Sequence, residues 1–187
     1  MAANVIIEVD TVAGQVKIQR LLKAVAPATL LNVIGARLVS YVDESFRTRG
    51  RGIWPALAAT TLLLRKRGGD MPLQDTGRYK QSFVTETDSR TYVEVGSNIQ
   101  TPDGRSLAKI HEFGTGPYTI RVKRARVLAA QTRFGNWLIF GKEVQHPGIP
   151  ARPVLPTKAV GERLVQETIN AMLARIDQPA SGRFGGS

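Results

Sequence analysis

Hydrophobic residues recur at steps of three and four positions between residues 28 and 46, which is the longest regular pattern in the chain. The positions are Leu31, Ile34, Leu38, Val42 and Phe46. This spacing places them on one face of a helix, while polar side chains such as Arg37 and Asp43 fall largely on the other. The pattern therefore predicts an amphipathic helix over residues 28–46.

A second apolar stripe near the C-terminus predicts a closing helix over residues 157–176. Its members are Val160, Leu164, Val165, Ile169, Met172, Leu173 and Ile176. They share one helical face, which suits a helix that packs on a core. Shorter helices are predicted over residues 15–25, 58–66 and 107–113.

Short β-branched and alternating stretches predict the strands. Residues 5–9 are almost entirely β-branched and predict an edge strand. Residues 83–87 and 91–96 alternate less regularly, and the polar connection at residues 88–90 between them predicts an antiparallel pair. Prolines fix the backbone at residues 147–153 and exclude a helix there, so this stretch is expected to be extended.

The stretch at residues 118–145 is predicted to form a long β-hairpin arm. Strands are expected at 118–122 and 136–140, with an alanine- and arginine-rich stretch between them. The apolar residues of the arm are too many for a solvated loop: Val127, Leu128, Trp137, Leu138, Ile139 and Phe140. An exposed apolar arm is typical of a contact surface.

These elements predict an α+β fold, in which a small, mainly antiparallel sheet packs against a long N-terminal helix and a C-terminal helix, with the β-hairpin arm protruding. The length of 187 residues suits one domain over residues 1–177. The Gly/Ser-rich residues 178–187 are expected to form a disordered tail. No apolar stretch approaches the roughly 20 residues of a membrane span, so no membrane partner is expected.

Positive charge is concentrated in two acid-free segments. The net charge is +11, and residues 47–67 and 119–142 each carry six cations without an acid. Such segments suit contact with nucleic acid or an acidic protein surface, although a solubilising surface is the alternative. The candidate DNA or partner contacts are Arg47, Arg49, Arg51, Arg65, Lys66, Arg67, Arg121, Lys123, Arg124 and Arg126.

Residues arranged for catalysis are missing from the sequence pattern. The absence of cysteine excludes disulfides and thiolate metal sites. His111 and His146 have no partner at metal-ligand spacing, and neither Gly50-Arg51-Gly52 nor Gly114-Thr115-Gly116 completes a phosphate loop. The acids form no obvious pair, although acids that cluster only on folding stay possible. We expect no catalytic residue, no metal and no cofactor.

Five motifs in order carry a family resemblance. They are Gly52-Ile53-Trp54-Pro55-Ala56-Leu57, Thr76-Gly77-Arg78-Tyr79, Val93-Glu94-Val95-Gly96-Ser97, Ala108-Lys109-Ile110-His111-Glu112-Phe113-Gly114 and Ile149-Pro150-Ala151-Arg152-Pro153-Val154-Leu155. Over residues 28–176 the chain resembles the phage virion morphogenesis family, the tail-completion or neck proteins of tailed phages and Mu-like prophages. Residues 101–106 look inserted, and the arm at 118–145 is longer than the minimal family has.

The resemblance implies a non-catalytic protein of the virion, present in the host cytoplasm during assembly, that forms a homo-oligomeric ring and joins tail to head. Its implied partners are head-completion and tail proteins, with DNA in the lumen. The family-motif residues are Trp54, Thr76, Gly77, His111, Gly114, Pro150, Arg152 and Pro153.

Several roles stay open for these motif residues. Gly77 and Gly114 permit tight turns or are ordinary loop glycines. Trp54 belongs to the core or to an interface. Arg152, held between two prolines, pairs with a carboxylate or is exposed and idle. The alternative functions are a non-specific nucleic-acid-binding protein, which the basic segments favour, and a hydrolase without a recognisable motif.

Overall fold

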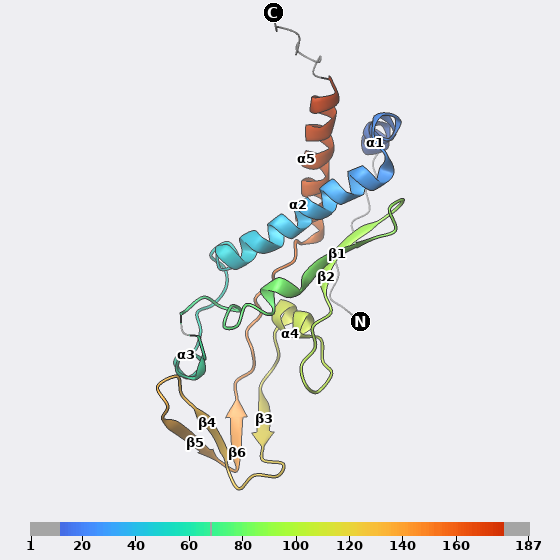
Figure 1. The fold of residues 1–187 in the computed structure, drawn as a ribbon. Coiled ribbons are helices and arrows are strands. Elements are labelled where there is room, and N and C mark those ends of the chain that lie inside the picture. The colour runs from blue at the N-terminus through green and yellow to red at the C-terminus, as the bar shows by residue number, and fades with distance from the viewer. Residues whose placement is uncertain (1–11, 68, 178–187) are drawn as a thin grey trace, which may run out of the picture. The chain divides into compact units, whose positions relative to one another are not determined.

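The computed structural model describes residues 12–67 and 69–177, and within them the chain forms five α-helices and six strands (Figure 1). The α+β prediction is confirmed. The helices are α1 (Val12–Ala24), α2 (Pro27–Arg47), α3 (Ala59–Leu64), α4 (Leu107–Phe113) and α5 (Lys158–Asp177), and a short 3₁₀ helix covers Lys80–Ser82. The strands are β1 (Phe83–Thr87), β2 (Val93–Ser97), β3 (Tyr118–Arg121), β4 (Leu128–Gln131), β5 (Trp137–Gly141) and β6 (Glu143–His146).

The described residues group into two compact units. Residues 41–84 and 96–155 make up the first, which we call the motif unit because it contains all the family-motif residues named above. Residues 12–40, 85–95 and 156–177 are the described part of the second, the helical unit. The predicted strand at 5–9 and the tail at 178–187 lie outside the described residues.

Helix α2 follows the predicted periodicity closely. It begins at Pro27, whose fixed φ and missing N–H suit the first turn of a helix. Ile34, Leu38, Val42 and Phe46 are buried as predicted, whereas at the start of the stripe Leu30 is buried and the predicted Leu31 is only half-buried. The regular step of four residues explains why one face of this helix is covered over its whole length.

In the helical unit α1 packs against α5, and the helix α2 lies close to the β1–β2 hairpin. Lys17 Nζ donates to Asn170 Oδ1 at 3.1 Å across the first contact. At the second, Gly35 leaves so little room that an added Cβ would lie 3.1 Å from Val93 Cγ2. The hairpin turn is held by Asp88, whose carboxylate accepts the hydroxyl of Thr91 and the N–H groups of residues 90–92. The pKa of Asp88 is lowered first by the hydrogen bond from the Thr91 hydroxyl and then by those from the N–H groups.

The motif unit has an aromatic core. The ring of Phe46, which is 0% exposed, meets the rings of Trp54, Tyr79 and Phe83 edge-on, at centroid distances of 5.8, 5.7 and 5.8 Å. Edge-to-face contacts of this kind add to the burial of the rings themselves. The C-terminal end of α2 is thereby joined to the segments that carry the first two motifs.

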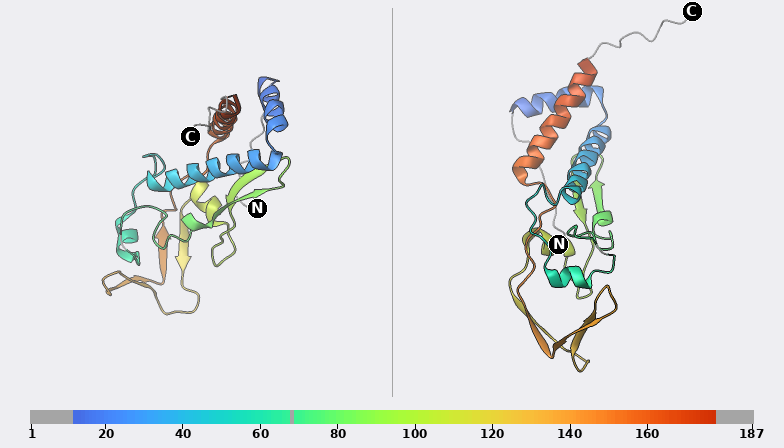
Figure 2. Two further views of the ribbon diagram at one scale, coloured as in Figure 1. Left: turned by 45° about the horizontal axis from the view of Figure 1, so that its top comes forward. Right: turned by 90° about the vertical axis from the view of Figure 1, so that its left-hand side faces the viewer.

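The arm at 118–145 is a hairpin, but its strands pair differently from the prediction. β3 pairs with β6, from Tyr118↔His146 to Arg121↔Glu143, and β4 pairs with β5, from Leu128↔Gly141 to Gln131↔Trp137. Strands β4 and β6 were not predicted, and 136–140 was expected opposite 118–122. The β3–β4 connection at 123–127 bulges out, and the arm bends there (Figures 1 and 2).

The tip of the arm returns to α3. The backbone N–H of Arg133 donates to the carbonyl oxygen of Leu63 at 2.8 Å, and Thr132 beside it is buried. The arm is therefore held at both ends, by the β3–β6 ladder at its base and by α3 at its tip.

Among the described residues, no single helix is both long and apolar enough to cross a bilayer. By length and composition only, residues 15–24 together with 27–47 pass as a pair bent by 117°.

Candidate assembly interface

The fifth motif forms an extended segment, residues 148–155, which we call the proline segment. As predicted, it has neither helix nor strand, apart from a bridge between Ile149 and Thr115. Its backbone groups are bonded from outside: Arg152 N–H donates to His111 O at 2.6 Å, and Val154 O accepts from Ser45 Oγ at 3.0 Å. Buried backbone groups need such partners, so the surrounding motifs determine where this segment lies.

Trp54 is one of these partners. Its indole Nε1 donates to the carbonyl oxygen of Pro153 at 2.8 Å, and the residue is 6% exposed. Gly50 lies against the ring, because a Cβ there would come within 2.1 Å of Nε1. Trp54 therefore belongs to the core of the motif unit and anchors the proline segment by a hydrogen bond.

Arg152 has neither of the roles that the sequence suggested. It is 5% exposed, and its guanidinium donates to the carbonyl oxygens of Pro55 at 3.0 and 3.2 Å and of Ala56 at 3.1 Å. Burial lowers its pKa. A guanidinium presents several donors in one plane, so it can bridge two carbonyl groups that a single donor could not. Arg152 therefore links the proline segment to the first motif.

Glu112 is a half-buried acid that was not among the predicted site residues. Its Oε2 accepts the N–H of Val154 at 2.9 Å and that of Leu155 at 3.5 Å. Burial raises the pKa of this carboxyl, and the two hydrogen bonds oppose that effect. The only sign in the sequence was the place of Glu112 in the fourth motif, since the burial of Ala108 and Ile110 in the same helix becomes visible only in the structure.

His111 is a packed, neutral histidine. Burial, and next the charge of Arg152, lower its pKa to about 4. Its ring lies 5.0 Å from that of Tyr79, whose pKa is raised by burial and then by Glu112. The carbonyl oxygen of His111 accepts the backbone N–H of Arg152, as described above. Among the described residues no group of three or more metal-ligating side chains surrounds it or any other position.

Thr76 and Gly77 form the turn before the 3₁₀ helix. Gly77 has φ +74°, and its carbonyl oxygen accepts the N–H of Gln81 at 3.0 Å. Thr76 Oγ1 accepts the N–H of Arg78 at 3.5 Å. The positive φ favours the tight-turn interpretation of Gly77.

Gly114 is required by both its backbone angle and its surroundings. Its φ is +72°, and an added Cβ would lie 2.6 Å from the carbonyl oxygen of Ile149. The neighbouring Thr115 N–H donates to that same oxygen at 2.8 Å. The chain therefore approaches the proline segment here as closely as only glycine allows.

Gly114→Ala is expected to destabilise the protein by roughly 3 kcal/mol, from a strained φ and a backbone clash. Gly104→Ala is the matched control, because Gly104 has φ +80° and open space around it. It should cost only about 1 kcal/mol, from the strained φ alone. Urea unfolding of both purified variants measures the difference, and equal losses would contradict the close approach at Gly114.

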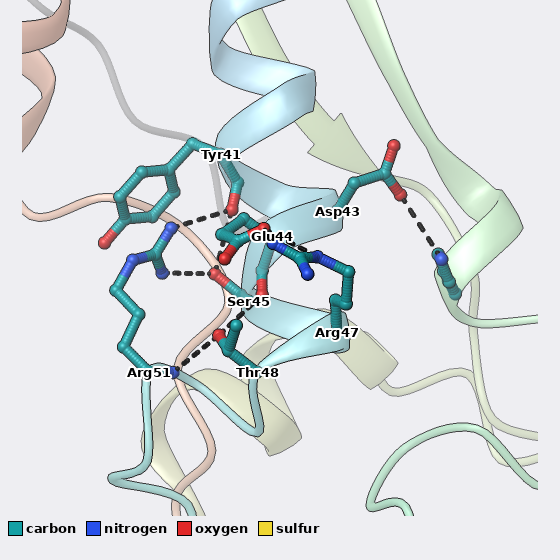
Figure 3. A network of polar contacts seen from close by, with 8 residues as sticks. Tyr41, Asp43, Glu44, Ser45, Arg47, Thr48 and Arg51 are labelled. Atoms are coloured by element: carbon teal, nitrogen blue, oxygen red, sulfur yellow. Dashed lines mark hydrogen bonds and ion pairs between the residues drawn. The ribbon is translucent and has the colours of Figure 1, made fainter.

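Four arginines of the first basic segment are bonded within the chain, and Figure 3 shows two of them, Arg47 and Arg51, at the end of α2. Arg47 contacts Glu44 at 2.6 Å, and Arg51 lies over the Tyr41 ring, 3.5 Å from its centroid, and donates to Ser45 Oγ at 2.7 Å. Arg49 pairs with Asp70 at 2.6 Å. These three side chains stabilise the turn after α2.

Arg65, in the same segment, is 6% exposed and donates to the carbonyl oxygen of Met71 at 2.8 Å. Its Nε lies 3.6 Å from Asp75. Lys66 and Arg67 are exposed. The structure therefore pairs three of the six cations of the first segment with acids and bonds Arg51 to neutral groups, which leaves Lys66 and Arg67 unpaired among the described residues.

The second basic segment is different. Arg121 pairs with Glu143 at 3.1 Å across the β3–β6 ladder. Within the described part of the chain, the exposed side chains of Lys123, Arg124 and Arg126 have no ion pair or hydrogen bond. The bulge at 123–127 thus presents three unpaired cations.

The arm also exposes apolar side chains. Trp137 is 64% exposed, Ile139 is 70% exposed and Phe134 at the tip is 65% exposed. Most of the motif residues, by contrast, are bonded inward. Of the contact residues predicted from the sequence, those of the arm, together with Lys66 and Arg67, are therefore available to a partner.

Comparison with known proteins identifies the class to which this fold belongs. The model of the phage virion morphogenesis family matches residues 9–174, so the chain belongs to that family. No curated protein and no solved structure matches it. Membership gives the chain a structural or assembly role in a phage virion, which agrees with the resemblance drawn from its motifs.

Proposed function

We propose that this chain is a neck or tail-completion protein, which joins tail to head as a homo-oligomeric ring and performs no catalysis. The observation that carries the proposal is the contrast between the motif residues and the residues of the arm. Trp54, Glu112 and Arg152 bond to the chain itself, whereas the arm exposes apolar side chains and unpaired cations. An assembly protein needs interfaces and a firm framework to hold them.

The charge bears on how the ring forms. A net charge of +11 on each copy opposes self-association at low salt. We therefore propose that the chain is monomeric or weakly associated alone, and that it assembles on a partner ring of head-completion or tail proteins. The cations of the arm would face acids there, which favours correct registry.

Removal of the gene tests this proposal. A phage without it is expected to accumulate filled heads and separate tails, and supply of the full-length chain is expected to restore joined particles. Electron microscopy of lysates counts the three species. Normal numbers of joined particles without the gene would contradict a role at the junction.

Non-specific binding to duplex DNA is the second candidate function, and the three unpaired cations at 123–127 favour it. Binding of this kind ignores sequence and weakens steeply with salt, because phosphate neutralisation releases counterions. The DNA that passes through a neck would be the natural ligand.

Changing Lys123, Arg124 and Arg126 together to Ala is expected to reduce the slope of log affinity against log salt by roughly 2 to 3. Changing Arg47, Arg49 and Arg51 to Ala should reduce it less, because these side chains already have partners. DNA retention at several salt concentrations measures both slopes. No retention at low salt would exclude the DNA function and leave the charge for protein contacts.

A further inference from the structure

The motif unit contains a groove of about 740 Å³, bounded by α3, by the loop at 99–102 and by the proline segment. Much of its wall is aliphatic, with Leu57, Leu64, Leu73, Ile99, Leu107 and Ile149 among the lining residues. The volume is that of sites that bury a ligand or several side chains. None of the residues that line it belongs to β4 or β5.

Three residues that line this groove hold a buried side-chain N or O atom without a hydrogen bond, and no other described residue does. The atoms are Arg65 Nε, which lies 3.6 Å from a carboxylate oxygen of Asp75, Tyr79 Oη and His111 Nδ1. Arg65 and Tyr79 are each 6% exposed. These atoms are closed off from solvent, so the surface that a partner can reach in the groove is mainly its aliphatic wall.

The arm supplies an apolar surface of matching character. The pairs Ala129↔Ile139 and Gln131↔Trp137 place these four side chains on one face of the β4–β5 hairpin, its outer face. Ala130 and Leu138 on the other face are half-buried. The exposure of Trp137 and Ile139 persists although the tip is already bonded to α3. Contacts within the chain therefore do not cover this face.

We propose that the outer face of the β4–β5 hairpin of one copy docks in the groove of the next copy. This inference rests on the proposed ring and names the surfaces that form it. Groove and hairpin use different residues, so the contact is head-to-tail and can repeat around a closed ring. The arm also borders the groove, since His146 at its base and Leu64 beside its tip contact are lining residues.

The exposed apolar surface of the hairpin is large enough only for a weak contact between two copies. Trp137 and Ile139 together contribute on the order of 300 Å² of apolar surface, against the roughly 800 Å² per partner of a stable interface. One such contact is weak, whereas a closed ring gives every copy two. The chain alone is then weakly associated, and the partner ring that gathers the copies completes the contact.

Electrostatics gives the contact a characteristic salt dependence. Arg65, Arg78 and Arg152 line the groove against the single acid Asp75, and the arm carries the unpaired cations at 123–127. Like charges oppose the docking and salt screens them, so self-association should strengthen as salt rises. Docking of an acidic partner in the same groove would weaken instead.

Because the chain has no cysteine, an engineered pair reports on this contact alone. Thr61 is exposed and lines the groove, so we choose Thr61→Cys with Ile139→Cys. Under oxidation at high salt, the full-length double variant is expected to give a ladder of dimers and higher multiples, and an equal mixture of the single variants to give dimers. Ile53→Cys with Thr61→Cys is the control, since Ile53 is also 70% exposed but does not line the groove.

Sedimentation measures the same contact without a cross-link. Ile139→Asp should weaken self-association at high salt roughly tenfold to a hundredfold, as the loss of one buried aliphatic side chain predicts. Ile53→Asp should leave it unchanged. The inference is wrong if the cross-link forms only within one chain, if the control pair forms the same ladder, or if association weakens with salt.

Cross-linking in purified virions separates this inference from the proposed function. If the gene is required to join heads and tails but virions show no Thr61–Ile139 cross-link between copies, the groove assignment fails and the function stands. If purified copies cross-link while virions contain none of the chain, the contact stands and the function at the junction fails.

Discussion

A variant in which Asn-Gly replaces residues 123–141 is expected to remain folded and to yield no more infectious particles than a phage without the gene. The β3–β6 ladder extends to a bond from Val122 N–H to Lys142 O at 3.1 Å, and a two-residue Asn-Gly turn can close it there. The change removes the exposed apolar face and the cation bulge together. Plaque titre measures function, and circular dichroism confirms that the helices persist.

Two smaller variants show whether the apolar face or the cations of the arm account for the loss of titre. Trp137→Ser with Ile139→Ser removes the apolar contact and leaves the cations, whereas Lys123, Arg124 and Arg126 changed to Ala leave the apolar face. The apolar variant is expected to reproduce most of the loss of titre. Normal titres from the Asn-Gly variant itself would show that the arm is dispensable.

Arg152→Ala is expected to lower the free energy of unfolding by about 3 kcal/mol, because it removes a buried guanidinium that donates three hydrogen bonds to two carbonyl oxygens. The affected oxygens are those of Pro55 and Ala56. Arg152→Lys should recover only part of the loss, since an ammonium group cannot reproduce the planar arrangement of the guanidinium.

Arg105→Ala is the matched control for this prediction. Its side chain is 59% exposed and pairs with Asp103, and an exposed pair contributes at most about 1 kcal/mol. Urea unfolding compares the three variants with the unchanged chain. If Arg152→Ala unfolded at the same urea concentration as Arg105→Ala, the guanidinium would not hold the proline segment.

The elements predicted best from the sequence are those with a local repeat. The pattern from Leu31 to Phe46 predicted α2 to within a residue at either end, because every fourth position faces the same core. The helix predicted at 157–176 likewise corresponds to α5. Repeats of this kind need no knowledge of the distant chain.

Pairings between distant residues could not be predicted in this way. β6 contains Glu143, Gln145 and His146, so its composition does not mark a strand, and its pairing with β3 depends on the bend in the arm. Arg152 was singled out correctly for its stiff backbone, but its partners are carbonyl oxygens 97 and 96 positions away. Carbonyl groups occur at every residue and leave no trace in a sequence.

The same limit affected the basic segments. In the sequence both segments are free of acids, and both were equal candidates for an anionic partner. Folding brings Asp70 to Arg49, 21 positions away, whereas the bulge at 123–127 receives no acid. Local charge counts therefore locate cations, and only the fold shows which of them are available.

The central claim is that this family member acts as part of the virion at the head–tail junction. Cryo-electron microscopy of the purified particle tests it most directly. We predict a ring of density at the junction into which α2, α5 and the bent arm fit, with each arm touching the next copy. Absence of the chain from the particle, or its location anywhere other than the junction, would contradict the account.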